Sequence, residues 1–164
     1  MDFRYLYTSF DGRINRKPFW IASLIMMAAA MVLSLVIVTP LTLMSPGLGV
    51  FVALLIWLAL LYPVVALGVK RLHDRGKSGQ LMAVFLAPSI LLQLGDLLGI
   101  TGSEQMVGGE MIYLPNMLGW LLVAASLGVA IWALVELGIL RGTTGPNAYG
   151  PDPLAGTAAQ PAAG

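Results

Sequence analysis

The sequence has 164 residues, of which 58% are apolar and only 10% carry a charge. A soluble domain carries about 25% charged residues, so this composition excludes an ordinary water-soluble globular protein. The chain has no cysteine and a single histidine. Disulfide and thiol chemistry are therefore absent, and we expect neither a metal nor a cofactor.

Residues 1–18 form an amino-terminal segment, and aromatic and polar residues alternate over its first part, residues 1–12. A strand would place these rings on mixed faces, so we predict a short helix that rests at the membrane interface. The apolar run that follows Lys17 is longer than the about 7 to 15 residues of a cleavable signal peptide. We therefore expect it to stay in the mature protein.

Residues 19–140 are predicted to be an all-α, polytopic membrane domain, because they contain four apolar runs of about the 20 residues needed to cross a bilayer. We predict a bundle of four transmembrane helices, at about 19–39, 48–69, 81–100 and 117–140. Pro40, Ser45, Pro46 and Gly47 are predicted to end the first span. The polar segment 70–80 separates the second span from the third, and the glycine-rich segment 101–116 is predicted to be an outer loop.

The basic residues set the expected orientation, because Lys and Arg near the ends of spans are retained on the cytoplasmic side. All nine fall on one side of the predicted spans: Arg4, Arg13, Arg16, Lys17, Lys70, Arg71, Arg75, Lys77 and Arg141. We therefore place both termini in the cytoplasm. The tail 141–164 is rich in Gly, Pro and Ala, lacks a pattern that could fold alone, and is expected to be flexible at its end.

Three polar segments together resemble the DUF805 family of small bacterial inner-membrane proteins. They are SFDGRINRKPFW at 9–20, RLHDRGKSG at 71–79 and GPNAYGPDP at 145–153. The resemblance implies four spans in the bacterial inner (plasma) membrane and implies no biochemical activity. The family usually has a Trp where this chain has Gln80, so any role of that ring is in doubt here.

All three segments lie on the cytoplasmic side of the predicted topology, so they can meet at one surface. One interpretation is a lipid-anchored reverse turn that sets topology, with its basic residues at headgroup level. The other is a site for a phosphate-bearing or carboxylate ligand, or a lipid headgroup, because Arg forks match such groups. That site would contain Arg13, Arg71, His73, Asp74, Arg75 and Ser78.

Contacts between these segments can also be predicted. Because His73 and Asp74 are adjacent, they point about 100° apart on a helix and cannot form a dyad with each other. We predict that Asp74 pairs with Arg13 or Arg16. Asn147 and Asp152 are predicted to fix the tail over the cytoplasmic loop.

Two acidic residues, Asp96 and Glu136, lie inside apolar runs, where a charge near the bilayer centre costs about 2.5 to 3.5 kcal/mol or more. Each is close enough to the end of its span to reach an interface. A proton or cation relay is one hypothesis for them, and a purely structural place near the headgroups is the other.

The sequence favours a non-enzymatic scaffold whose cytoplasmic face binds anionic lipid headgroups or a membrane-protein partner. The alternative is a small ion or solute transporter, or its accessory subunit, that uses Glu136 or Asp96. An enzyme ranks last, because it needs a nucleophile, a base or a metal cluster, and the chain offers one His, no Cys and no acidic cluster. Nucleic-acid binding would need a larger basic surface. The oligomeric state stays open, a homo-oligomer included.

Overall fold

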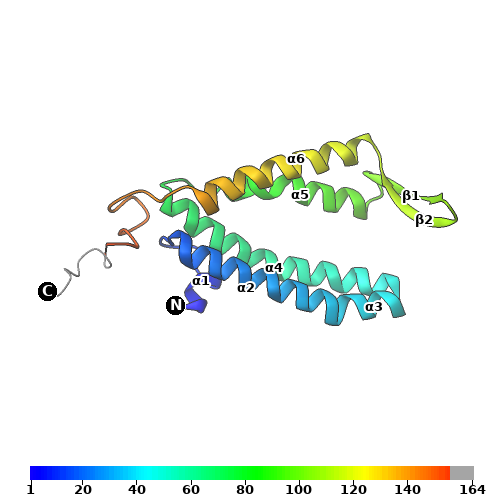
Figure 1. Ribbon diagram of the computed structural model, residues 1–164, viewed down its shortest axis with the longest axis horizontal. Coiled ribbons are helices and arrows are strands. Elements are labelled where there is room, and N and C mark those ends of the chain that lie inside the picture. Colours follow the sequence, from blue (N-terminus) through cyan, green and yellow to red (C-terminus); the bar gives the residue numbers. More distant parts are fainter. Residues whose placement is uncertain (156–164) are drawn as a thin grey trace. The chain divides into compact units, whose positions relative to one another are not determined.

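A computed structural model describes residues 1–155 of the chain, which is mostly helical (Figure 1). In chain order the elements are α1 (Phe3–Thr8), α2 (Arg16–Leu33), the π-helix η1 (Ser34–Val38), α3 (Thr39–Met44), α4 (Pro46–Asp74), α5 (Leu81–Leu97), β1 (Gly102–Val107), β2 (Glu110–Pro115), α6 (Met117–Ala133) and the π-helix η2 (Leu134–Ile139). The short amino-terminal helix and the four apolar helices predicted from the sequence are therefore present. The expected flexibility of the tail's end falls on residues 156–164, outside the described residues.

Three helical stretches of the described chain are long and apolar enough to cross a membrane, and α5 is a shorter apolar helix. The three are Arg16–Met44, Pro46–Asp74 and Met117–Ile139. Their outward side chains are apolar: Met27, Val36 and Leu127 are each more than 60% exposed. Soluble proteins rarely expose continuous apolar surface of this kind, whereas lipid solvates it. The chain is therefore a membrane protein by composition and by surface.

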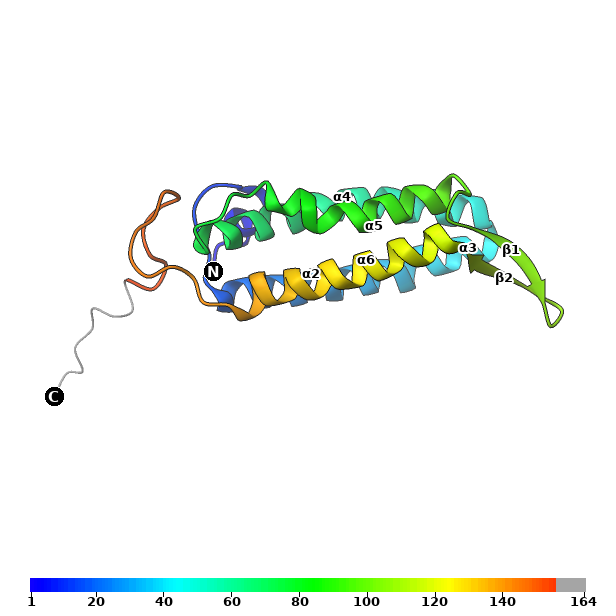
Figure 2. The same ribbon diagram turned by 90° about the horizontal axis from the view of Figure 1, so that it is seen from above.

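The chain divides into two compact units, and the first consists of Met1–Gly79 together with Leu137–Gly164. Within it, α2 and α4 run side by side and α1 packs against α4 (Figures 1 and 2). The small apolar core joins these helices through Leu6, Ile14, Ala22 and Leu67. The three polar segments of the sequence all belong to this unit.

The first apolar helix is longer than predicted, because Pro40 does not end it. Helical structure runs from Arg16 to Met44 through the π-helix η1. A proline removes one backbone donor and clashes with the preceding turn, and a π-helical turn relieves both by changing the local register. The Thr39 amide donates to Ser34 O, and the Thr39 hydroxyl donates to the same carbonyl at 3.0 Å. The helix ends only at Ser45.

The second unit, Gln80–Glu136, contains α5, α6 and a β-hairpin. The predicted outer loop 101–116 is wrong in detail, because β1 and β2 pair antiparallel there with Val107 opposite Glu110. The two connecting residues, Gly108 and Gly109, have φ of 63° and 92°. A tight two-residue hairpin turn requires positive φ at both positions, which glycine adopts without strain.

Candidate functional site

Four side chains from the three polar segments, together with Thr143 just before the third segment, meet at one end of the first unit, where α2 begins and α4 ends. We call this group the polar clamp; its members are Arg13, Arg71, Asp74, Thr143 and Asn147. Members that lie up to 130 positions apart in the sequence are joined by direct hydrogen bonds. The clamp therefore fixes the amino-terminal segment, the end of α4 and the tail to one another.

The Asp74 carboxylate is the centre of the polar clamp. Its Oδ1 accepts from Arg13 Nε at 3.3 Å and Arg13 Nη2 at 3.1 Å, and its Oδ2 accepts from Arg71 Nη1. The side chains of Arg13, Arg71 and Asp74 are at most 4% exposed. A buried charge is tolerated only when it is paired and hydrogen-bonded, and all three groups meet that condition. The predicted ion pair of Asp74 is thus formed with Arg13.

Arg13 uses its remaining donors on the tail. Its Nη1 donates to Gly145 O at 2.8 Å, and its Nη2 donates to Thr143 O at 2.7 Å. Thr143 returns a bond from its amide to Asp74 O at 2.8 Å. Residues 141–155 therefore take up a defined position although their sequence has no helical or strand periodicity.

The two residues predicted to dock the tail behave differently. Asn147 Nδ2 donates to His73 O at 2.9 Å, so it fixes the tail to the end of α4 as expected. Asp152 instead accepts from the backbone amides of Gly145 and Leu154, each at 2.9 Å. These two bonds hold the pKa of Asp152 below its ordinary value, and they close a turn inside the tail rather than bridging to the loop.

A second set of contacts satisfies the carbonyl groups at the end of η2. The last carbonyls of a helix have no partner within it. Here Arg71 Nε donates to Leu137 O at 2.7 Å, Trp20 Nε1 to Gly138 O at 3.1 Å and Arg16 Nη1 to Ile139 O at 3.1 Å. Arg71 Nη2 also donates to Leu140 O. Arg16 thus docks the amino-terminal segment to η2 and not to Asp74.

Lys70 likewise donates hydrogen bonds to unpaired backbone carbonyls, here at the end of α1. Its side chain is buried, and its ammonium donates to the carbonyls of Tyr5 and Leu6, each at 2.8 Å, and to that of Ser9. The ammonium also lies 5.0 Å from the centroid of the Tyr5 ring, within range of a cation–π contact. Burial raises the pKa of the Tyr5 phenol. Sequence reasoning put Lys70 and Arg71 at headgroup level and missed these bonds, although unpaired carbonyls at two helix ends could have suggested them.

The other predicted site residues surround the polar clamp. The His73 ring stacks on Tyr149 with centroids 3.8 Å apart, and its Nδ1 lies 3.2 Å from Gly12 O. Arg75 donates to Arg141 O. Ser78 is exposed in the turn after α4. His73 is therefore a stacking and hydrogen-bonding residue that joins the tail to the first segment.

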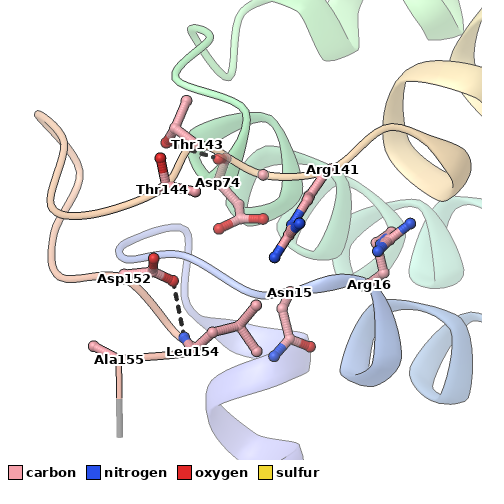
Figure 3. Close-up of a pocket in the computed structure, with 10 residues that line it drawn as sticks. Asn15, Arg16, Asp74, Arg141, Thr143, Thr144, Asp152, Leu154 and Ala155 are labelled. Carbon is pink, nitrogen blue, oxygen red and sulfur yellow. Dashed lines mark hydrogen bonds between the residues drawn. The ribbon is translucent and has the colours of Figure 1, made fainter. Parts of the chain in front are cut away.

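Beside the polar clamp lies a pocket of about 230 Å³. In Figure 3, Arg16, Arg141 and Asp74 line one part of it, and Asp152 and Leu154 lie across from them. Arg13 and Arg71 direct their donors to Asp74 and to backbone carbonyls, so a ligand in the pocket would meet Arg16 and Arg141 instead. Among residues 1–155 no group of three or more His, Asp or Glu side chains could hold a metal ion.

The two acids that the sequence predicts inside apolar spans lie outside the polar clamp. Asp96, at the end of α5, accepts from Tyr113 Oη at 2.6 Å and from the Thr101 hydroxyl. It therefore anchors the hairpin to the helix. Glu136 is 4% exposed and lies in the π-helix η2.

Comparisons with known proteins agree with the three-segment pattern. Residues 7–151 match the family model described as "Protein of unknown function (DUF805)". The uncharacterized protein YiiR of Escherichia coli K12 is 32% identical over 144 residues, which cover 88% of this chain and 85% of YiiR. The inner membrane protein YhaI of the same strain is 28% identical over 151 residues, which cover 92% of this chain and 91% of YhaI. No solved structure matches the chain. The chain therefore belongs to the DUF805 family, and with such relatives it is an inner-membrane, multi-pass protein.

Proposed function

We propose that the protein is a non-enzymatic membrane scaffold whose clamped polar end binds anionic lipid headgroups. The observation that carries this proposal is that some basic residues are buried and hydrogen-bonded while others are exposed. Three basic residues are buried and donate hydrogen bonds to acceptors within the protein: Arg13, Lys70 and Arg71. Four others are exposed: Arg4, Arg16, Lys17 and Arg141. The buried residues fix the polar end of the first unit, and the exposed residues provide positive charges that can bind lipid headgroups.

The topology that suits this proposal has four spans with both termini in the cytoplasm. α2 begins, and α4 and η2 end, at the polar clamp, so the basic residues of the first unit gather at one end of these helices. Each basic residue near an anionic leaflet contributes about 1 kcal/mol of attraction. α5 has 17 residues. Its length is about 25 Å, against about 30 Å for the bilayer core, so a fourth span would also use the apolar residues that follow it.

The proposal is tested by reconstituting the full chain in nanodiscs of mixed phosphatidylglycerol and phosphatidylcholine and identifying retained lipid by native mass spectrometry. We expect phosphatidylglycerol to be enriched over its bulk fraction. The triple variant Arg16→Gln, Lys17→Gln, Arg141→Gln should lose most of that enrichment. The hairpin variant Glu104→Gln, Glu110→Gln should keep it. Retained lipid of bulk composition in the unsubstituted protein would refute the proposal.

Transport is the second candidate, and the buried Glu136 in a π-helical stretch is the observation that favours it. Such stretches occur frequently at functional sites, and intramembrane acids mark ion pathways. Asp96 is a weaker candidate because its carboxylate already holds the hairpin. If the chain transports ions, Glu136→Gln should abolish flux in proteoliposomes while thermal stability is kept. Unchanged flux would remove Glu136 from the pathway.

A further inference from the structure

We infer that the pocket beside the polar clamp is a specific site for one phosphate group, held between the guanidinium groups of Arg141 and Arg16. This inference rests on the proposed function, because it names the chemical group that the polar end recognises. It also moves the binding residues away from Arg13 and Arg71, which sequence reasoning favoured, to an arginine in the tail.

The first support is the availability of Arg141. Its guanidinium forms no hydrogen bond or ion pair with any residue among 1–155, although its backbone carbonyl accepts from Arg75. Arg16 donates one hydrogen bond, from its Nη1 to Ile139 O. Arginine forks bind phosphate in two-point geometry, so two such groups on one pocket wall form a suitable cradle.

The second support is the local charge. The two acids of the pocket wall, Asp74 and Asp152, already accept from buried arginines or from backbone amides. Arg13 and Arg71 already bind the Asp74 carboxylate, and the pocket wall adds the guanidinium groups of Arg16 and Arg141. The balance favours an anion over a cation.

The third support is the position and size of the pocket. Asn15, the residue that caps α2, lies in its wall, so the positive end of a long helix faces it. Thr143 and Thr144 also line it and carry hydroxyl groups. At about 230 Å³ the pocket is smaller than the about 300 to 1,000 Å³ of typical drug-sized sites. It suits a single small anionic group better than a nucleotide.

Two sources could supply that group: an anionic phospholipid headgroup or free inorganic phosphate. The test is a titration of the full chain, in neutral maltoside detergent, first with inorganic phosphate and then with dihexanoyl-phosphatidylglycerol. Dihexanoyl-glycerol, which lacks phosphate, is the blank. We expect saturable binding of one phosphate group per chain to at least one of the two probes.

Variants make the test specific to the pocket. Arg141→Gln should weaken affinity at least about tenfold, the expected cost of losing a charge-assisted contact. It removes no bond of the polar clamp, so thermal stability should not change. Arg141→Lys keeps the charge but loses the two-point fork, so its affinity should lie between those of Arg141→Gln and the unsubstituted protein. Lys17→Gln removes an exposed charge one position from Arg16 but outside the pocket, and should change affinity less than about twofold, because exposed charges are strongly screened.

The outcomes separate the inference from the proposed function. Equal weakening by Arg141→Gln and Lys17→Gln, or no saturable binding of either probe, would overturn the inference. If phosphatidylglycerol enrichment in nanodiscs is the same in Arg141→Gln as in the unsubstituted protein, the scaffold proposal stands and the pocket is not its site. Binding of inorganic phosphate without lipid enrichment would support the pocket and overturn the scaffold proposal.

Discussion

Two aspartates each hold a segment outside the long helices, but they do so in opposite environments. Asp74 is 3% exposed and receives bonds from two buried arginines, and it fixes the tail and the amino-terminal segment. Asp96 is exposed and receives bonds from the hydroxyls of Tyr113 and Thr101, and it fixes the hairpin. The negative charge of Asp74 is compensated by positively charged guanidinium groups, whereas the Asp96 carboxylate is bound by neutral hydroxyl donors.

The difference between the two aspartates shows what a carboxylate needs when it is buried. A charge that is removed from water needs paired charge and a full set of hydrogen bonds, so every member of the polar clamp depends on the others. An exposed carboxylate keeps water as an alternative partner, so loss of one hydroxyl should be mild. Substitutions at Asp74 should therefore cost more stability than substitutions at Asp96.

Asp74→Ala should destabilise the protein most, by about 3 to 5 kcal/mol, because it leaves two buried guanidinium groups without a counter-charge. Thermal unfolding in detergent and abundance in the membrane measure the effect. Asp96→Ala is the matched control in the second unit and should cost about 1 kcal/mol or less. Equal losses for the two variants would contradict the contrast.

Exchanging two charges tests whether the Arg13–Asp74 pair depends on the rest of the polar clamp. Exchanging the charges of Arg13 and Asp74 should not restore abundance, because Arg71 would then face a new arginine and the carbonyls of Thr143 and Gly145 would face a carboxylate. A double-mutant cycle on Arg13→Ala and Asp74→Ala should instead give a coupling energy of about 1 to 3 kcal/mol. Full restoration by exchange would mean that the pair acts independently of the rest of the clamp.

Gly142→Ala should have the next largest effect. A Cβ at Gly142 would lie 2.6 Å from Asp74 Cγ, so the tail backbone would have to move away from the carboxylate. We expect a loss of about 1 to 3 kcal/mol, as for other overpacked sites, read as a lower unfolding temperature. Gly128→Ala, where nothing lies within 4 Å, is the control and should be neutral or slightly stabilising.

Tyr113→Phe should release the hairpin with little effect elsewhere. It removes the hydroxyl that donates to Asp96 and lies 3.1 Å from the Thr101 hydroxyl, at a cost of about 0.5 to 1 kcal/mol. Amide exchange over residues 102–115 should speed up, while exchange in α2 and α4 stays unchanged. Glu110→Gln at the hairpin turn is the control. Faster exchange at the polar clamp in Tyr113→Phe would show that the two units are coupled, contrary to this prediction.

The sequence predicted the parts of this protein that follow from periodicity and charge. The four apolar helices, the short helix α1, a pair between Asp74 and either Arg13 or Arg16, and the Asn147 contact were all accessible, because each depends on residue type and on the order of apolar and polar segments. The helix through Pro40 was not, since a π-helical turn leaves no simple composition signal. The hairpin was missed although Gly108-Gly109 between two alternating runs is a known turn signal. The burial of Lys70 and Arg71 was missed because it depends on carbonyls that are distant in sequence.

Acid should open the turn inside the tail, and this is the smallest expected effect. Bonds from the amides of Leu154 and Gly145 hold the pKa of Asp152 below its ordinary value of 3.8. A carboxylate with a lowered folded-state pKa stabilises the turn fully above its unfolded pKa, and that stabilisation is lost as the pH falls through the folded pKa. The amide shifts of Gly145 and Leu154 should therefore be constant from pH 8 to about 5 and should titrate together below about pH 4. Asp152→Ala should abolish this titration, and a midpoint above 3.8 in the unsubstituted protein would show that the carboxylate does not hold the turn.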